Sequence, residues 1–218
     1  MKKLNPIEES NFINDEFKEY LKDTFHFNNI EYQRLFEKEL DNQALYKGPY
    51  LSINLPFTST KSINEMIACK KMSPLFKKFS NLDFNRKLYK HQYLAFDKIS
   101  SGHNVVITTG TSSGKTESFL YPILNSILRE IEQGNTQVGI RAVFLYPMNA
   151  LVFYQMSRLR DILKTFPQIT YGFFTGDTKE KISKSFRENS DIEYPINELL
   201  SREEMRNTPP ELLISSYS

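Results

Sequence analysis

A short β-branched run that leads into a loop of small residues and one lysine constrains this chain most strongly. Residues 104–109 read Asn-Val-Val-Ile-Thr-Thr, which is typical of a buried parallel strand, and residues 109–116 read Thr-Gly-Thr-Ser-Ser-Gly-Lys-Thr. An apolar stripe at helical spacing follows and ends at Gly134; its members are Phe119, Leu120, Ile123, Leu124, Ile127, Leu128 and Ile131. A strand, a small-residue loop and a helix in this order predict an anion site at the helix N-terminus.

The side chains of the loop favour a nucleoside triphosphate as the anion. Its small residues let backbone N–H groups converge on phosphate; they are Gly110, Thr111, Ser112, Ser113 and Gly114. Lys115 can reach the β- and γ-phosphates, and the Thr116 hydroxyl can bind Mg²⁺, as in a Walker A loop. Thr109 stands where the strict pattern has glycine. The alternative is a plain turn in which Lys115 is only a solvated charge.

Composition excludes several other classes of protein. Of the 218 residues, 39% are hydrophobic and 25% are charged, which supports a real core. One cysteine, Cys69, excludes an internal disulfide, and three scattered histidines exclude a Cys/His zinc pattern. The longest apolar stretch, Phe119–Leu128, is broken by Pro122 and is too short for a membrane span. With no targeting segment visible, we expect a cytoplasmic protein without a membrane partner.

The chain divides by its sequence pattern into three parts. Residues 1–47 predict a helical region with a break at Phe25–Asn29, and residues 48–87 predict a basic connector with an edge strand at Leu51–Leu55 and a helical patch at Ile63–Phe79. Residues 88–218 alternate between strands and helices. The strands are predicted over 104–109, 141–146, 169–174 and 211–216, and a helix over Asn149–Leu163. This order predicts an α/β fold with a parallel sheet.

Several motifs resemble those of superfamily 2 DEAD/DEAH-box helicases. The loop at 109–116 resembles motif I, whose first residue is Ala or Thr in this family. Leu88-Tyr-Lys-His-Gln92 resembles the glutamine motif that precedes it, and Tyr146-Pro-Met-Asn-Ala-Leu-Val-Phe-Tyr-Gln155 resembles motif Ia of the YprA-like branch. Phe153 and Tyr154 depart from the polar pair expected before Gln155. The resemblance covers Leu88–Ser218 and implies a RecA-like P-loop NTPase domain.

The resemblance also implies roles for individual residues. Gln92 would read adenine through its amide, with Tyr89 packed on the base, so ATP and Mg²⁺ are the expected cofactors. Lys115 and Thr116 would be catalytic, with Thr116 as the metal ligand. The expected nucleotide-binding set is Tyr89, Gln92, Thr109, Gly110, Thr111, Ser112, Ser113, Gly114, Lys115, Thr116 and Glu117. Motif Ia, the loop at 174–178 and a motif Ib-like strand end at 208–218 would hold nucleic acid through Pro147, Asn149, Ala150, Gln155, Thr175, Gly176, Asp177 and Ser216.

The family's next element, an apolar strand ending in Asp-Glu, does not follow within these 218 residues. The adjacent pair Asp15-Glu16 lies in a helical context instead. We therefore expect an incomplete RecA-like domain with an unpaired parallel edge, which binds ATP and nucleic acid, DNA favoured over RNA, without efficient hydrolysis or unwinding. Two alternatives stay open: a P-loop phosphotransferase, and a non-enzymatic truncated or split module completed by a chain that supplies the remaining helicase motifs.

Overall fold

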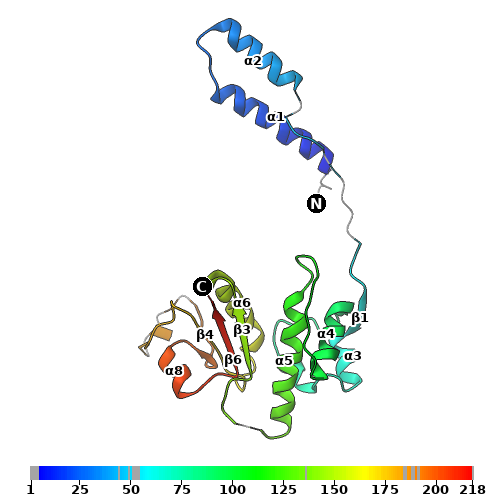
Figure 1. Cartoon of the computed structure of the whole chain (residues 1–218), viewed down its shortest axis with the longest axis vertical. Coiled ribbons are helices and arrows are strands. Elements are labelled where there is room, and N and C mark those ends of the chain that lie inside the picture. Colours follow the sequence, from blue (N-terminus) through cyan, green and yellow to red (C-terminus); the bar gives the residue numbers. More distant parts are fainter. Residues whose placement is uncertain are drawn as a thin grey trace. The chain divides into compact units, whose positions relative to one another are not determined.

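The computed structural model describes residues 5–43, 45–48, 50, 55–135, 137–183, 186–187, 190 and 192–217. The chain forms two compact units, Met1–Pro56 and Phe57–Ser218 (Figure 1). The sequence predicts a separate connector over 48–87, but the structure divides after Pro56, because Ile63 and Phe76 are buried in the core of the second unit. The predicted edge strand lies outside the described residues except for Leu55, which is exposed.

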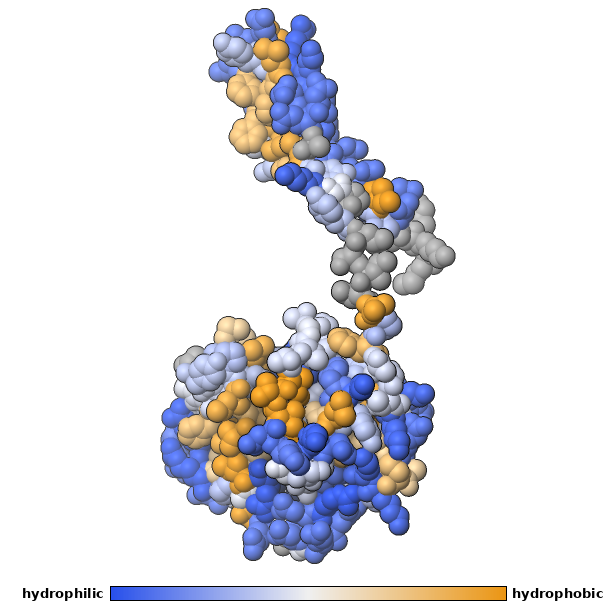
Figure 2. Space-filling model, turned by 45° about the vertical axis from the view of Figure 1, so that its right-hand side comes forward, coloured by the Kyte–Doolittle hydropathy of each residue, from blue (hydrophilic) through white to orange (hydrophobic). Residues whose placement is uncertain are grey.

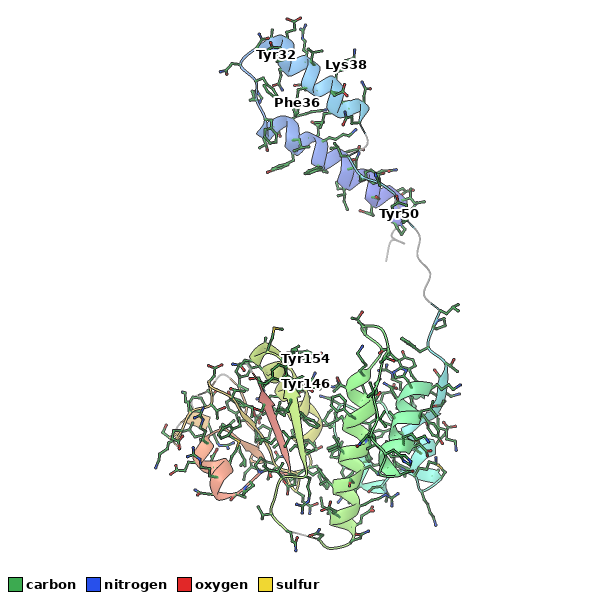
Figure 3. All side chains as sticks on the ribbon, viewed as in Figure 1. Tyr32, Phe36, Lys38, Tyr50, Tyr146 and Tyr154 are labelled. Atoms are coloured by element: carbon green, nitrogen blue, oxygen red, sulfur yellow. The ribbon has the colours of Figure 1, made fainter. Side chains whose placement is uncertain are left out.

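The first unit is a hairpin of two helices, α1 (Pro6–Thr24) and α2 (Ile30–Asn42). Asn29 caps α2 by accepting hydrogen bonds from the first amides of that helix, which confirms the predicted break. Phe36 lies between the helices, with its ring 5.4 Å from that of Phe27 (Figure 3). Apolar side chains remain exposed on the hairpin (Figure 2), among them Ile13, Phe17 and Tyr20.

The second unit contains a four-stranded parallel sheet in the order β3-β6-β4-β5. Its strands are β3 (Ala142–Tyr146), β4 (Tyr171–Phe174), β5 (Glu198–Leu199) and β6 (Leu212–Ser216). The helix α6 (Asn149–Leu163) connects β3 to β4, and the short helix α8 (Arg202–Asn207) precedes β6. The predicted strands over 141–146, 169–174 and 211–216 and the predicted helix α6 are confirmed, as is the parallel α/β class.

Two helices and an antiparallel ribbon complete this unit. The helices α4 (Lys90–Ser100) and α5 (Lys115–Glu132) pack against each other. The ribbon pairs β1 (Ser59–Ser62) with β2 (Lys87–Tyr89). Between these strands, the predicted helical patch forms a short helix α3 (Ile63–Ala68) and a 3-10 helix η1 (Pro74–Lys78), because proline begins a new helix more readily than it continues one. Among the described residues, no helix is long and apolar enough to cross a bilayer.

The predicted strand at 104–109 is wrong in this structure. The described segment 103–110 has no strand assignment, and Val106 is 88% exposed. A β-branched run supplies strand propensity but no hydrogen-bonding neighbour, and within the described residues β3 is paired on one side only, with β6. The predicted unpaired edge therefore does not lie at 104–109; among the described residues β3 is an edge strand, with Val143 and Leu145 exposed along it.

Candidate functional site

The loop between residues 109 and 116 presents free backbone donors at the start of α5. Ser112 and Gly114 have left-handed φ values of 57° and 72°. Such a backbone turns successive N–H groups into a concave anion site. Among the described residues, no acceptor is assigned to the N–H groups of residues 110–114. The conformation therefore fits a phosphate group, and the dipole of the 18-residue helix α5 adds positive potential.

Lys115 lies across this loop. Its Nζ donates to the carbonyl oxygens of Thr109 at 2.8 Å and Gly110 at 2.6 Å. The Thr109 Oγ1 lies 2.6 Å from the Ser113 Oγ, so threonine at the first position ties the two ends of the loop together, which glycine could not do. Thr116 is half-buried in the first turn of α5. The amine is thus held at the loop, where a phosphate can replace the two carbonyl contacts.

The Gln92 side chain is a brace that connects the loop to the residue before α4. It is 4% exposed, and its Nε2 donates to the Gly114 carbonyl at 2.9 Å while its Oε1 accepts from the Tyr89 N–H at 2.8 Å. A Cβ on Gly114 would lie 2.4 Å from the Gln92 Nε2, so this position has no room for a side chain. The amide is used within the chain, and the reading of adenine by Gln92 stays a prediction.

Three aromatic rings lie together beside the brace. Tyr89 lies 5.2 Å from Phe57 and 5.7 Å from His91, between ring centroids, and the His91 Nε2 is 2.8 Å from the Ser113 carbonyl. Sequence reasoning singled out Tyr89 but missed Phe57 and His91. His91 belongs to the same five-residue motif, whereas Phe57 is brought close only because β1 pairs with β2. This cluster offers a flat apolar surface for a base.

Glu117 forms an ion pair with α6, and its contact with the nucleotide stays a prediction. Its Oε1 accepts a hydrogen bond of 2.5 Å from Arg158 of α6, and the side chains are 16% and 27% exposed. Its Oε2 is buried, and no partner is assigned to it among the described residues. The sequence predicted a nucleotide contact for Glu117 and gave no signal for Arg158.

The carboxyl ends of three strands bring together three of the predicted nucleic-acid residues. Asn149, the first residue of α6, donates through Nδ2 to the Asp177 Oδ2 at 2.7 Å, and its Oδ1 accepts from the Ser216 Oγ at 2.6 Å. We call these three residues the edge cluster. Motifs that are separate in sequence therefore form one polar group at one edge of the sheet.

The other predicted nucleic-acid residues surround the edge cluster less directly. Thr175 is buried, and its N–H donates to the Thr178 Oγ1, whereas Gly176 is exposed. Arg202, which the sequence did not identify, donates to the Thr175 carbonyl at 2.9 Å and so fixes this loop. Pro147 and Ala150 are exposed, and Gln155 is half-buried. Among the described residues, no hydrogen bond joins Gln155 to the edge cluster. Tyr146 and Tyr154 lie at the same end of the unit (Figure 3).

Parts of this chain are similar to known proteins in sequence and in fold. Residues 89–207 match the DEAD/DEAH box helicase family. Druantia protein DruE of Escherichia coli (strain UMEA 4076-1) is 33% identical over 126 residues, 55% of this chain and 7% of DruE. The uncharacterized ATP-dependent helicase YprA of Bacillus subtilis (strain 168) is 34% identical over 107 residues, 49% of this chain and 13% of YprA.

A solved structure of the DUF1998 helicase MrfA bound to DNA is similar with a TM-score of 0.51 and 25% identity, over 75% of this chain and 18% of MrfA. The chain spans less than a fifth of the length of DruE, YprA or MrfA. The match to the family model covers the braced loop, α6 and the loop at 174–178. The chain belongs to the DEAD/DEAH box helicase family.

Proposed function

We propose that this chain is the ATP-binding portion of an ATP-dependent nucleic-acid helicase or translocase. The observation that carries the proposal is the loop at 109–116, whose free N–H groups and lysine stand at the start of α5. The family match supports ATP as the nucleotide and Mg²⁺ as its usual companion. Lys115 and the loop amides would hold the phosphates, and Thr116 would contribute a hydroxyl ligand to Mg²⁺, which neutralises phosphate charge when bound.

The edge cluster is the proposed contact for nucleic acid. Amide, carboxylate and hydroxyl groups there stand beside the N-terminus of α6, which has no side-chain cap. Amide N–H groups at such an end can donate to a phosphodiester backbone without reading sequence. DNA is favoured over RNA because the similar MrfA structure is bound to DNA. The cytoplasm is the proposed location.

We further propose that the polypeptide of residues 1–218 binds ATP and nucleic acid but hydrolyses ATP poorly by itself. Within this sequence, an Asp-Glu pair occurs only at Asp15-Glu16, in α1 of the first unit. Groups that activate water and neutralise the transition state contribute several orders of magnitude to such reactions. The open edge of β3, with Val143 and Leu145 exposed, supports completion by a strand from a chain that supplies the remaining motifs.

Replacement of Asn149 by alanine tests the nucleic-acid part of the proposal. Asn149→Ala breaks both hydrogen bonds of the edge cluster, and we expect binding of a labelled dT oligomer to weaken about tenfold, measured by fluorescence anisotropy. Asn64, which bonds the exposed Asn85, provides a matched control, because Asn64→Ala removes a similar amide elsewhere. Equal affinities in the two variants would contradict a role of the edge cluster.

Replacement of Gln92 by alanine separates the brace from base reading. Because both ends of the Gln92 amide bond the backbone, Gln92→Ala should weaken ATP and GTP alike, by about tenfold, through a misplaced Gly114. Calorimetric titration with both nucleotides measures this. A loss confined to ATP would instead support the predicted reading of adenine by Gln92.

A further inference from the structure

An ion pair connects the helix that follows the phosphate loop to the helix that carries the edge cluster. Glu117 lies in the first turn of α5, two residues after Lys115, and Arg158 lies in α6. The Arg158 Nη2 and the Glu117 Oε1 are 2.5 Å apart. The ion pair is therefore a direct link between α5 and α6.

One end of this link touches the phosphate loop, and the other lies on the helix that begins with Asn149 of the edge cluster. The Glu117 Oε2 lies 3.0 Å from the point that a Cβ on Gly114 would occupy, so the carboxylate touches the last turn of the loop. On the other side, Asn149 begins the same helix that carries Arg158, nine residues earlier, which is about 14 Å along a rigid helix. We therefore expect a movement of the loop to displace Arg158 and, through α6, Asn149.

The surroundings of the pair allow a second arrangement. Glu117 and Arg158 line a cavity of about 290 Å³ that is also bordered by Asp83, Arg86 and Asp161. Arg158 could pair there with either aspartate, and Glu117 with Arg86. Coupling between sites needs an element with two discrete arrangements that both sites bias, and the charged groups that border this cavity are the proposed alternative partners of the pair.

We propose that the Glu117–Arg158 pair couples nucleotide binding at the loop to nucleic-acid binding at the edge cluster. Arg158 acts as a positioning residue, and Glu117 links it to the loop. The inference rests on the proposed function, since it requires both sites. A phosphate that draws the loop inward shifts Glu117, and Arg158 transmits this shift along α6 to Asn149.

The experiment measures how a dT oligomer changes the affinity of the 218-residue chain for AMPPNP, a non-hydrolysable ATP analogue. The ratio to be compared is the Kd for AMPPNP without the oligomer divided by the Kd with it. We expect this ratio to be about five or more in the unchanged chain. In Glu117→Gln and Arg158→Gln this ratio should fall to about one, and in Arg158→Gln each ligand alone should bind within about twofold of the unchanged chain. Arg158→Lys keeps the charge and should retain most of the coupling.

A second ion pair on α5 provides the matched control. Glu130, near the other end of this helix, accepts a 2.8 Å bond from the Arg141 Nε, with 33% and 24% exposed side chains. Glu130→Gln should leave the ratio unchanged. An equal fall in Glu130→Gln, or an undiminished ratio in folded Glu117→Gln and Arg158→Gln, would overturn the inference. A ratio of one in the unchanged chain overturns it while the proposed function stands, whereas failure to bind either ligand overturns both.

Discussion

Replacing Lys115 by alanine is expected to weaken AMPPNP binding by about 100-fold, or about 3 kcal/mol. The Lys115 ammonium is held at the loop by the carbonyls of Thr109 and Gly110, so it lies within the proposed phosphate site. Hydrogen bonds to an ionised phosphate are charge-assisted and stronger than neutral ones. Removing the amine therefore removes the largest single attraction that the side chains of this loop supply.

Isothermal titration calorimetry of the 218-residue chain measures this effect. Lys98→Ala is the control, because Lys98 is an exposed cation in the last turn of α4, and its loss changes net charge equally. We expect its affinity to match that of the unchanged chain. If Lys115→Ala bound AMPPNP with unchanged affinity, the loop would not be a phosphate site.

The sheet and its flanking helices could be predicted where local pattern and tertiary structure agree. The apolar stripe of α5 and the helix over Asn149–Leu163 follow from side-chain spacing alone, and α6 has the predicted bounds. The run at 104–109 has a strand propensity like that of the runs that form the sheet, but it has no neighbour to pair with in the described sheet. Strand formation depends on a partner, which propensity cannot report.

Some residues of the candidate site could likewise be predicted from the sequence, and others could not. Residues of the phosphate loop were predictable because one contiguous segment supplies the backbone donors. Phe57 and Arg158 were not, since β-ribbon pairing and helix packing bring them to Tyr89 and Glu117 across long stretches of sequence. For Glu117, the sequence did not indicate the ion pair with Arg158. Side-chain direction is set by the partner that satisfies the charge, and that partner lies in another element.

Replacing Arg160 by methionine is expected to destabilise the second unit by about 3–5 kcal/mol. Arg160 of α6 donates two hydrogen bonds, of 2.7 and 2.6 Å, to the carboxylate of Glu198 in β5, whose side chain is 1% exposed. Tyr171 also donates to this carboxylate, and burial together with the Glu198 charge raises the pKa of the Tyr171 phenol, so it stays protonated and remains a donor. Without Arg160, the carboxylate is buried with one neutral donor.

A double-mutant cycle separates the buried charge from the loss of packing. Urea unfolding followed by circular dichroism should show that Arg160→Met with Glu198→Gln recovers much of the stability lost in Arg160→Met, because no charge is then buried. Arg206→Met is the control: its ion pair with Glu180 is 59% and 54% exposed, and its loss should cost about 1 kcal/mol or less. Since α6 also carries Asn149 and Arg158, equal losses in Arg160→Met and Arg206→Met would mean that the buried pair does not anchor the helix that carries both residues.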